Sequence, residues 1–376
     1  MATLDRRCAS NPIRYLAGLP TICRNRLKSL TSQQPQPISV FQEMKLTTAF
    51  KSLTALGMAI LVVAAAGCTK YSKTPQAGSA TNGITKLACD VTFENIMQQE
   101  IEVFEYIYPH ADVLPYYLDE KSCIDSLLEQ KVNAAVTTRP LNEAEKKYLK
   151  SKKKTVYERI IAIDAIALVV NNDNPIDRID LKDLNDILTG KLQTWDQMGP
   201  GMKDLGSIDV VFDDESSSTV SFMRDSLMNG VAFGSNVYAQ GSNEAVYEAV
   251  KKKKNAIGVL GVSWLSADLD GKPASSIEEL AKASERSDTT VLDFKPDIKV
   301  LKVQQPGTPM YWKPYQQYIY EGKYPLLRAI YMVTTSVPGT PAHGFYSFVT
   351  GVQGQKLILL TGILPSQVHP RKVQLL

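Results

Sequence analysis

The stretch Asp164-Ala-Ile-Ala-Leu-Val-Val-Asn171 carries the strongest fold signal in the sequence. Between its polar ends the run is apolar at every position, so it does not alternate polar and apolar residues. A run of this kind is typical of a β-strand that is buried on both faces. The turn-forming group Asn172-Asp-Asn-Pro175 follows it and ends the strand. We therefore predict a central, fully covered strand over 164–171.

On both sides of this strand, strand patterns alternate with helix patterns. In the first helix, for example, Phe93, Ile101 and Phe104 fall at helical spacing, and Pro109 ends it. The predicted strands are 84–90, 113–118, 133–138, 208–212, 256–261 and 329–335. The predicted helices are 92–107, 122–130, 181–189, 218–228, 243–253 and 344–360. This alternation indicates right-handed βαβ units and a mostly parallel sheet. Two such α/β lobes, joined by extended crossovers, would hold a ligand in the cleft between them.

The charge of the chain is unevenly distributed. Of its 42 basic and 39 acidic side chains, residues 1–67 hold eight basic and two acidic ones, so the first segment carries +6 and the remainder −3. A nucleic-acid-binding function would therefore depend on the leader alone, and we expect none. With 44% apolar and 22% charged residues, the body has the composition of a globular protein rather than a disordered or polytopic membrane protein.

The first 67 residues read as an upstream extension followed by an export signal. Lys45 and Lys51 precede an apolar segment over 55–66, which is too short to span a bilayer as a helix. Ala65-Ala66-Gly67-Cys68 follows and resembles the bacterial lipobox, in which the cysteine is lipidated after cleavage. We expect a lipid on Cys68, a flexible tether over 68–83 and a start at Met1 or Met44. The choice between inner and outer membrane stays open.

The remaining cysteines and the histidines indicate no metal site. Cys89 and Cys123 lie in the body, and a disulfide between them or two buried thiols are both compatible with the sequence. There is no CxxC motif, and the three histidines are far apart in the chain. We expect neither a metal nor a cofactor.

Hydroxyl-bearing residues mark three junctions between a strand and a helix. The strongest is Ser216-Ser217-Ser218-Thr219, where side-chain hydroxyls would adjoin the unpaired amides of a helix start and form an anion cradle. Simple N-capping would need only one of the four. Thr137-Thr138-Arg139 ends the third strand, and Thr92-Phe93 follows the first. Arg139 has a forked donor set that suits an oxyanion, or alternatively a surface salt bridge with Glu143 or Glu145.

These residues, with several further motifs, resemble the phosphate-binding periplasmic component of the high-affinity phosphate ABC transporter. The similarity covers nearly all of residues 84–365. It includes Leu188-Thr-Gly-Lys-Leu-Gln-Thr-Trp-Asp196, Asn255-Ala-Ile-Gly-Val-Leu-Gly261, Tyr324-Pro-Leu326 and Gly362-Ile-Leu-Pro365. The resemblance implies a two-lobed type II periplasmic-binding-protein fold with two hinge crossovers. It also implies phosphate binding by Ser217–Thr219 from one lobe and by Thr92 and Phe93 from the other.

The chain departs from the family pattern at several site positions. The family glycine between serine and threonine is Ser218 here, and the family arginine before that loop is replaced within Asp213-Asp214-Glu215. The family aspartate that accepts the phosphate proton aligns with Thr138. We therefore expect Arg139 to supply the positive charge, and Asp164 or Glu120 to accept the proton. That acceptor decides between phosphate and fully ionised sulfate.

No catalytic motif is present: the sequence has no GxSxG elbow, P-loop, HExxH or GxGxxG. We expect a monomeric, membrane-anchored lipoprotein at the periplasmic face that captures inorganic phosphate for an ABC permease. The alternatives are another oxyanion (molybdate, tungstate or sulfate) or an envelope sensor or scaffold of the same fold. The expected organisation is extension and signal peptide, tether, lobe 1, lobe 2, and the second part of lobe 1, over 1–67, 68–83, 84–170, 171–264 and 265–376.

Overall fold

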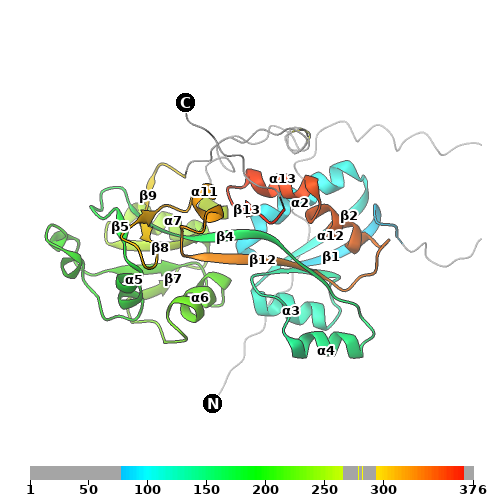
Figure 1. Ribbon diagram of the computed structural model, residues 1–376, viewed down its shortest axis with the longest axis horizontal. Coiled ribbons are helices and arrows are strands. Elements are labelled where there is room, and N and C mark those ends of the chain that lie inside the picture. The colour runs from blue at the N-terminus through cyan, green and yellow to red at the C-terminus, as the bar shows by residue number, and fades with distance from the viewer. Residues whose placement is uncertain (1–77, 266–277, 279–281, 283–293, 368–376) are drawn as a thin grey trace, which may run out of the picture. The chain divides into compact units, whose positions relative to one another are not determined.

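The computed structural model describes residues 78–265, 278, 282 and 294–367 (Figure 1). The expected signal peptide, the lipid-attachment residue Cys68 and most of the tether lie outside these residues. Among the residues described, no helix is long and apolar enough to cross a membrane.

The predicted central strand is the axis of the structure. It is β4, Tyr157–Asn171, and it begins earlier than predicted because its first half pairs along its length with β12, Leu327–Thr334. Its second half pairs with β8, Ala256–Gly261. In Figure 1 β4 and β12 run side by side, and β4 continues beyond β12 to pair with β8. The apolar run Ala165–Val170 is fully buried, as predicted.

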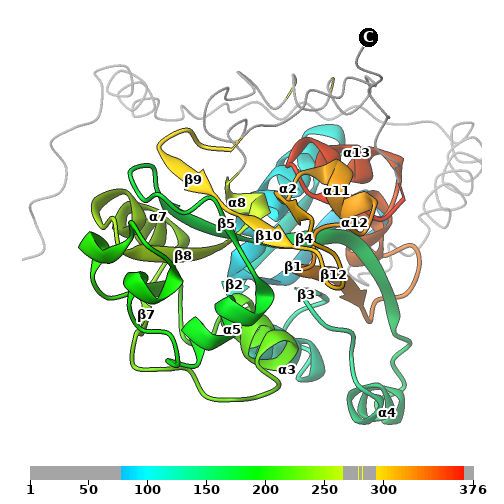
Figure 2. The same ribbon diagram turned by 60° about the vertical axis from the view of Figure 1, so that its left-hand side comes forward.

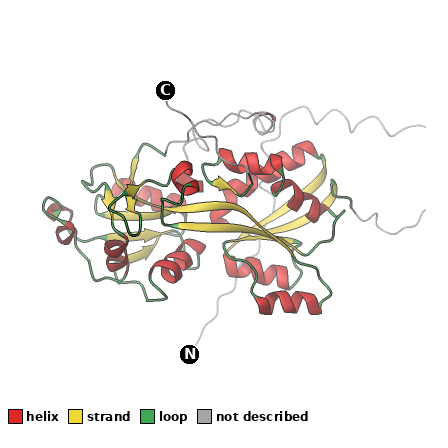
Figure 3. Ribbon diagram, viewed as in Figure 1, coloured by secondary structure: helices red, strands yellow, loops and turns green. Residues whose placement is uncertain are grey.

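The first half of β4 belongs to a group of strands in the order β2-β1-β3-β12-β4. Here β1 pairs in parallel with both β2 and β3, whereas β12 is antiparallel to β3 and β4. The strands are β1 Asn82–Asp90, β2 His110–Leu118 and β3 Ala134–Thr137. The helices are α2 Glu94–Ile107, α3 Glu120–Leu128, α4 Glu143–Ser151, α12 Pro341–Val349 and α13 Val352–Leu360. Figure 3 shows α2, α12 and α13 on one face of these strands and α3 and α4 on the other.

The second half of β4 belongs to the order β4-β8-β6-β7. The further strands are β6 Asp209–Phe212, β7 Val237–Ala239 and β9 Ile298–Val300, the last of which pairs with the end of β4. The helices are α5 Leu181–Leu188, α6 Ser218–Phe222, α7 Asn243–Lys252 and α8 Val262–Leu265. A small sheet of β5 Arg178–Ile179, β10 Lys302–Gln304 and β11 Tyr311–Trp312 lies beside them, and α11 Gln316–Tyr320 and β13 Leu364–Pro365 follow (Figure 2).

Three features differ from the prediction. The sheet is mixed rather than mostly parallel, because β12 and β4 meet their neighbours antiparallel. The predicted helix 344–360 is two helices, which are separated at Gly351. The predicted helix 218–228 has only five α-helical residues before it continues as a π-helical turn, Met223–Leu227. Local periodicity does not report strand direction or a change of helix type, because both depend on the neighbouring elements.

Candidate functional site

Two of the three predicted junctions meet in the structure. Thr92 lies in the short 3-10 turn between β1 and α2, where the side chain of Asp90 accepts from its amide at 2.9 Å. Ser218 begins α6, after the loop that leaves β6. The hydroxyls of Thr92 and Ser218 share a hydrogen bond of 3.3 Å, and both residues are buried. The two junctions are therefore in direct contact although 126 positions separate them.

The positive charge at this contact is Arg328, which the sequence analysis missed. Its Nη1 donates to Ser218 Oγ at 3.0 Å and to Thr219 Oγ1 at 3.3 Å, and its guanidinium carbon lies 4.9 Å from the Phe93 ring centroid. Its side chain is only 2% exposed. A desolvated guanidinium that faces hydroxyls is a strong donor set for an oxyanion. We call Thr92, Phe93, Ser218, Thr219 and Arg328 the arginine–hydroxyl cluster.

Arg328 is held by Asp164, which stands directly opposite it in the register of β12 and β4. Its Nε and Nη2 donate to Asp164 Oδ2 at 3.0 and 2.8 Å. Burial raises the pKa of Asp164, and the charge of Arg328 opposes that shift. Gly261 makes room for the pair, because a Cβ there would lie 3.1 Å from both Arg328 Nη2 and Asp164 Oδ2. The sequence offered one signal for this pair, an arginine at the start of an otherwise apolar strand. A charged side chain is rarely buried in such a strand unless it has a partner.

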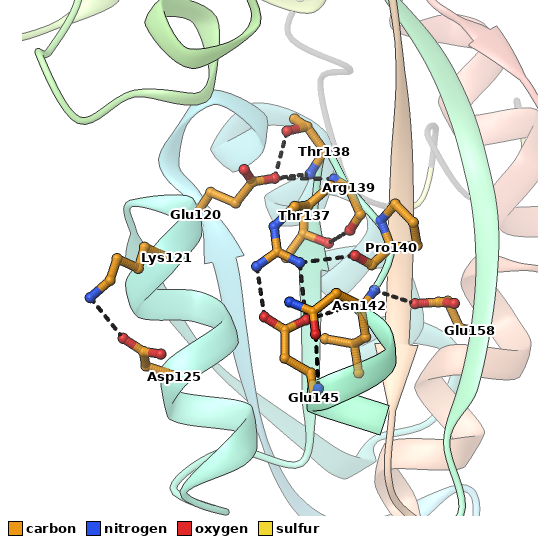
Figure 4. Close-up of polar contacts among 11 residues, drawn as sticks. Glu120, Lys121, Asp125, Thr137, Thr138, Arg139, Pro140, Asn142, Glu145 and Glu158 are labelled. Atoms are coloured by element: carbon orange, nitrogen blue, oxygen red, sulfur yellow. Dashed lines mark hydrogen bonds and ion pairs between the residues drawn. The ribbon is translucent and has the colours of Figure 1, made fainter. Parts of the chain in front are cut away.

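Arg139, the predicted source of positive charge, is paired elsewhere. Its Nη1 and Nη2 donate to the two carboxylate oxygens of Glu145 at 3.0 and 2.8 Å, and Nη1 also donates to the carbonyl of Pro140 (Figure 4). This is the salt-bridge alternative considered from the sequence. The Arg139 side chain is 42% exposed, whereas that of Arg328 is buried.

Thr137, Thr138 and Ser216 also make local contacts. Thr137 Oγ1 donates to the carbonyl of Arg139 at 2.8 Å. Thr138 donates from its amide and its hydroxyl to Glu120 Oε1, which is drawn in Figure 4. Ser216, which is exposed, donates to Asp214 Oδ1 from its amide and its hydroxyl. The assignment of these side chains to an anion site stays a prediction.

Both proton acceptors expected from the sequence accept hydrogen bonds from within the chain. Asp164 accepts from Arg328 and, at Oδ1, from the Ser263 amide at 3.4 Å. Glu120 Oε1 accepts from Thr138 and from the Arg139 amide.

Asp213, like Asp90, which caps Thr92, is a carboxylate with a free, buried oxygen near this cluster. Its Oδ1 accepts from Ser217 Oγ at 2.6 Å, its Oδ2 has no hydrogen-bond partner, and the residue is 3% exposed. Burial raises the pKa of Asp213, although the hydrogen bond from Ser217 and the charge of Arg328 oppose the shift. An isolated buried carboxylate oxygen is costly, so this atom is suited to accept a proton or a donor from a ligand.

The two body cysteines are free thiols. Cys89 and Cys123 are both buried, and burial raises the pKa of each. Among the residues described, no group of three His, Cys, Asp or Glu side chains is placed to hold a metal ion.

Comparison with known proteins gives one consistent result. A family model described as PBP superfamily domain matches residues 74–352. The Phosphate-binding protein PstS of Pseudomonas aeruginosa is 21% identical over 340 residues, which cover 86% of this chain and 95% of that protein. The Phosphate-binding protein PstS of Staphylococcus aureus is 25% identical over 246 residues, 65% of this chain and 73% of that protein.

A solved structure has the same fold. It is a putative phosphate ABC transporter substrate-binding protein with bound phosphate from Clostridium perfringens. It superposes with a TM-score of 0.58 at 18% identity, over 76% of this chain and all of that one. The two-lobed α/β fold expected from the sequence is therefore confirmed, and the relatives are binding proteins rather than enzymes.

Proposed function

Because the chain belongs to the PBP superfamily, we propose that it is a solute-binding protein that captures inorganic phosphate and delivers it to an ABC permease. The observation that carries the proposal is the buried guanidinium of Arg328, which faces the hydroxyls of Ser218 and Thr219. The names of the relatives support phosphate as the solute. The protein performs no covalent chemistry, and a change between open and closed forms takes the place of catalysis.

The arginine–hydroxyl cluster would bind the anion with donors from separate parts of the chain. Arg328 would attract the anion without help from lysines on the surface. In a desolvated site the attraction between unlike charges is much stronger than in water. Thr92 and Ser218, which now bond to each other, would turn their hydroxyls to the phosphate oxygens. Asp164 keeps the guanidinium in position from the opposite strand.

Asp213 gives the site its preference among oxyanions. Phosphate carries a proton at neutral pH, and Asp213 Oδ2, free and buried, would accept it. Sulfate has no proton to offer and would meet a carboxylate without compensation. Asp213 thus takes the acceptor role expected of Asp164 or Glu120.

Titration calorimetry of the purified protein with phosphate tests the proposal. We expect binding in the wild type, a loss on the order of tenfold in Ser218→Ala, and a larger loss in Arg328→Lys, which keeps the charge but not the fork. Arg139→Ala is the matched control, and we expect it to bind as the wild type does.

Three results would contradict parts of this proposal. If Arg139→Ala loses phosphate binding and Arg328→Lys keeps it, Arg139 and not Arg328 supplies the positive charge of the site. Heat with sulfate or molybdate but none with phosphate would favour another oxyanion. No heat with any of these anions would favour a sensor or scaffold of the same fold.

We further propose that the protein is monomeric and is held at the periplasmic face of a membrane by a lipid on Cys68. The lipobox-like sequence before Cys68 supports the anchor. A tether of small and polar residues would then give the body room to reach the permease.

A further inference from the structure

The end of helix α4 carries a dense group of lysines. Lys147 and Lys150 lie one turn apart on the helix, and Lys152, Lys153 and Lys154 follow where the chain leaves it. Four of the five are exposed, and Lys154 is half-buried. Among the residues that the structure describes, none of the five forms an ion pair. We call these five side chains the α4 lysine cluster.

A second lysine run in the chain has its charge compensated. Lys251 to Lys254 end α7, and each of them lies 2.7 to 3.7 Å from a carboxylate oxygen. The acids of α4, in contrast, are Glu143 and Glu145 in its first turn, and Glu145 is paired with Arg139. A helix dipole favours lysines at the end of either helix, so it does not account for the difference. The charge of the α4 lysine cluster is therefore open to a partner of opposite charge.

The position of the cluster indicates what kind of partner this is. Tyr157, three residues after the cluster, packs edge-on against the ring of His343 in α12, with the ring centroids 4.7 Å apart. Gly78 begins the described body and lies against the same helix, because a Cβ there would be 2.8 Å from Pro341 Cγ. The α4 lysine cluster therefore lies at the end of the body where the chain arrives from Cys68.

We propose that the α4 lysine cluster docks on the anionic headgroups of the membrane that holds the protein. The choice of a membrane rests on the proposed lipid on Cys68. Gly78 is ten residues along the chain from Cys68, so it lies at most about 36 Å from the lipid.

Charge then decides which end of the body approaches the membrane. The body as a whole is net negative and is repelled by an anionic surface, whereas the α4 lysine cluster is attracted to it. A basic patch beside an acyl chain also holds a protein to a membrane more firmly than the acyl chain alone. The contact would therefore orient the body as well as strengthen its attachment.

Acetylation of surface lysines, followed by mass spectrometry, tests the proposal on the purified full-length protein. The protein is mixed with vesicles of phosphatidylcholine, or of phosphatidylcholine with phosphatidylglycerol, at low salt. We expect the anionic vesicles to slow acetylation of Lys150, Lys152 and Lys153 severalfold, because the headgroups cover them. Lys252 and Lys253 in α7 are the internal control and should react equally with both kinds of vesicle. High salt should remove the protection.

Two matched triple variants separate the cluster from the total charge. Both are made in Cys68→Ala, which carries no lipid on that residue, and both lower the net charge by the same amount. They are Lys150→Gln, Lys152→Gln and Lys153→Gln in α4, and Lys252→Gln, Lys253→Gln and Lys254→Gln in α7. In flotation with anionic vesicles we expect the α4 variant to bind more weakly, on the order of tenfold or more. The α7 variant should bind as Cys68→Ala does.

The proposal is overturned if the α4 lysines are acetylated equally with neutral and anionic vesicles, or if the α7 lysines are protected to the same degree. Equal vesicle binding by the two triple variants would also overturn it. Protection by inorganic phosphate without vesicles would indicate a site for small anions instead. Failure of the lipid anchor is a separate result, because detergent partitioning of the wild type measures it and the Cys68→Ala background does not depend on it.

Discussion

Arg328, in its pairing with Asp164, shows how a candidate site residue is missed when only local sequence is considered. They are 164 positions apart, and only the antiparallel pairing of β12 with β4 sets them opposite each other. Arg139 follows two threonines in the sequence and was therefore the expected source of charge. Both of its Nη atoms bond to Glu145, whereas Arg328 pairs with Asp164 and still has Nη1 directed at Ser218 and Thr219. The side chain that is desolvated has the stronger electrostatic interaction with a ligand, and burial is a tertiary property.

Glu100 is another buried carboxyl group that the sequence analysis did not identify. It is fully buried in α2, and neither of its carboxylate oxygens has a hydrogen-bond partner. Gly354 leaves space beside it, because a Cβ there would lie 2.7 Å from Glu100 Oε2. Burial raises the pKa of Glu100 well above its ordinary value. Folded protein therefore keeps this proton at pH values where the unfolded chain has lost it.

This pKa shift predicts how stability changes with pH. Since the folded pKa is the higher one, the contribution of Glu100 is complete below the unfolded pKa and is lost as the pH rises through the folded pKa, at up to about 1.4 kcal/mol per pH unit. Glu100→Gln has no proton to lose, so its free energy of unfolding minus that of the wild type should increase as the pH rises. Urea denaturation between about pH 5 and pH 9 measures this difference. Glu102→Gln on the same helix is the control, and parallel curves for all three proteins would refute the prediction.

At the scale of elements, β4 joins the two groups of strands. Its first half pairs with β12 and its second with β8, so a single continuous strand belongs to both groups. Close packing of α7 on β8 and β4 depends on Gly258. A Cβ at Gly258 would lie 2.7 Å from Val250 Cγ2 and 2.8 Å from Val169 Cγ2.

Gly258→Ala should therefore destabilise the protein by about 1 to 3 kcal/mol through overpacking. Val250→Ala opens space at the same point, so the double variant should lose less free energy of unfolding than the sum of the two single variants. Gly322→Ala is the matched control, because Gly322 has a φ of 64° and nothing within 4 Å of its Cβ position. The loss of free energy of unfolding in Gly322→Ala should be additive with the loss in Val250→Ala. Additive losses for Gly258→Ala and Val250→Ala would show that no such contact exists.

At the scale of the whole molecule, the charge of the chain divides at the expected cleavage site. The segment before Cys68 carries +6 and the rest carries −3. A net-negative body that holds an anion must do so locally, and the arginine–hydroxyl cluster provides a buried charge for this purpose. The same arithmetic places the excess of basic over acidic residues in the part that export would remove.

Lipid attachment predicts where the protein partitions. We expect wild-type protein from cells to enter the detergent phase, and Cys68→Ala to stay in the aqueous phase, because one acyl chain or more supplies the apolar surface. Cys89→Ala is the control, since Cys89 is buried in β1 and should not affect partitioning. A Cys68→Ala protein that still partitions like the wild type would rule out this anchor.

Local patterns in the chain were enough for the α/β class, the central strand over 164–171 and the Thr92 and Ser217–Thr219 junctions. These features depend on residues close together in sequence, whose hydrophobic spacing and turn chemistry are visible without the fold. The antiparallel centre of the sheet, the break at Gly351, the pairing of Arg328 with Asp164 and the free oxygen of Asp213 were not accessible in this way. Each depends on which distant segment a residue meets and on how much water that contact excludes, and only the folded chain sets both.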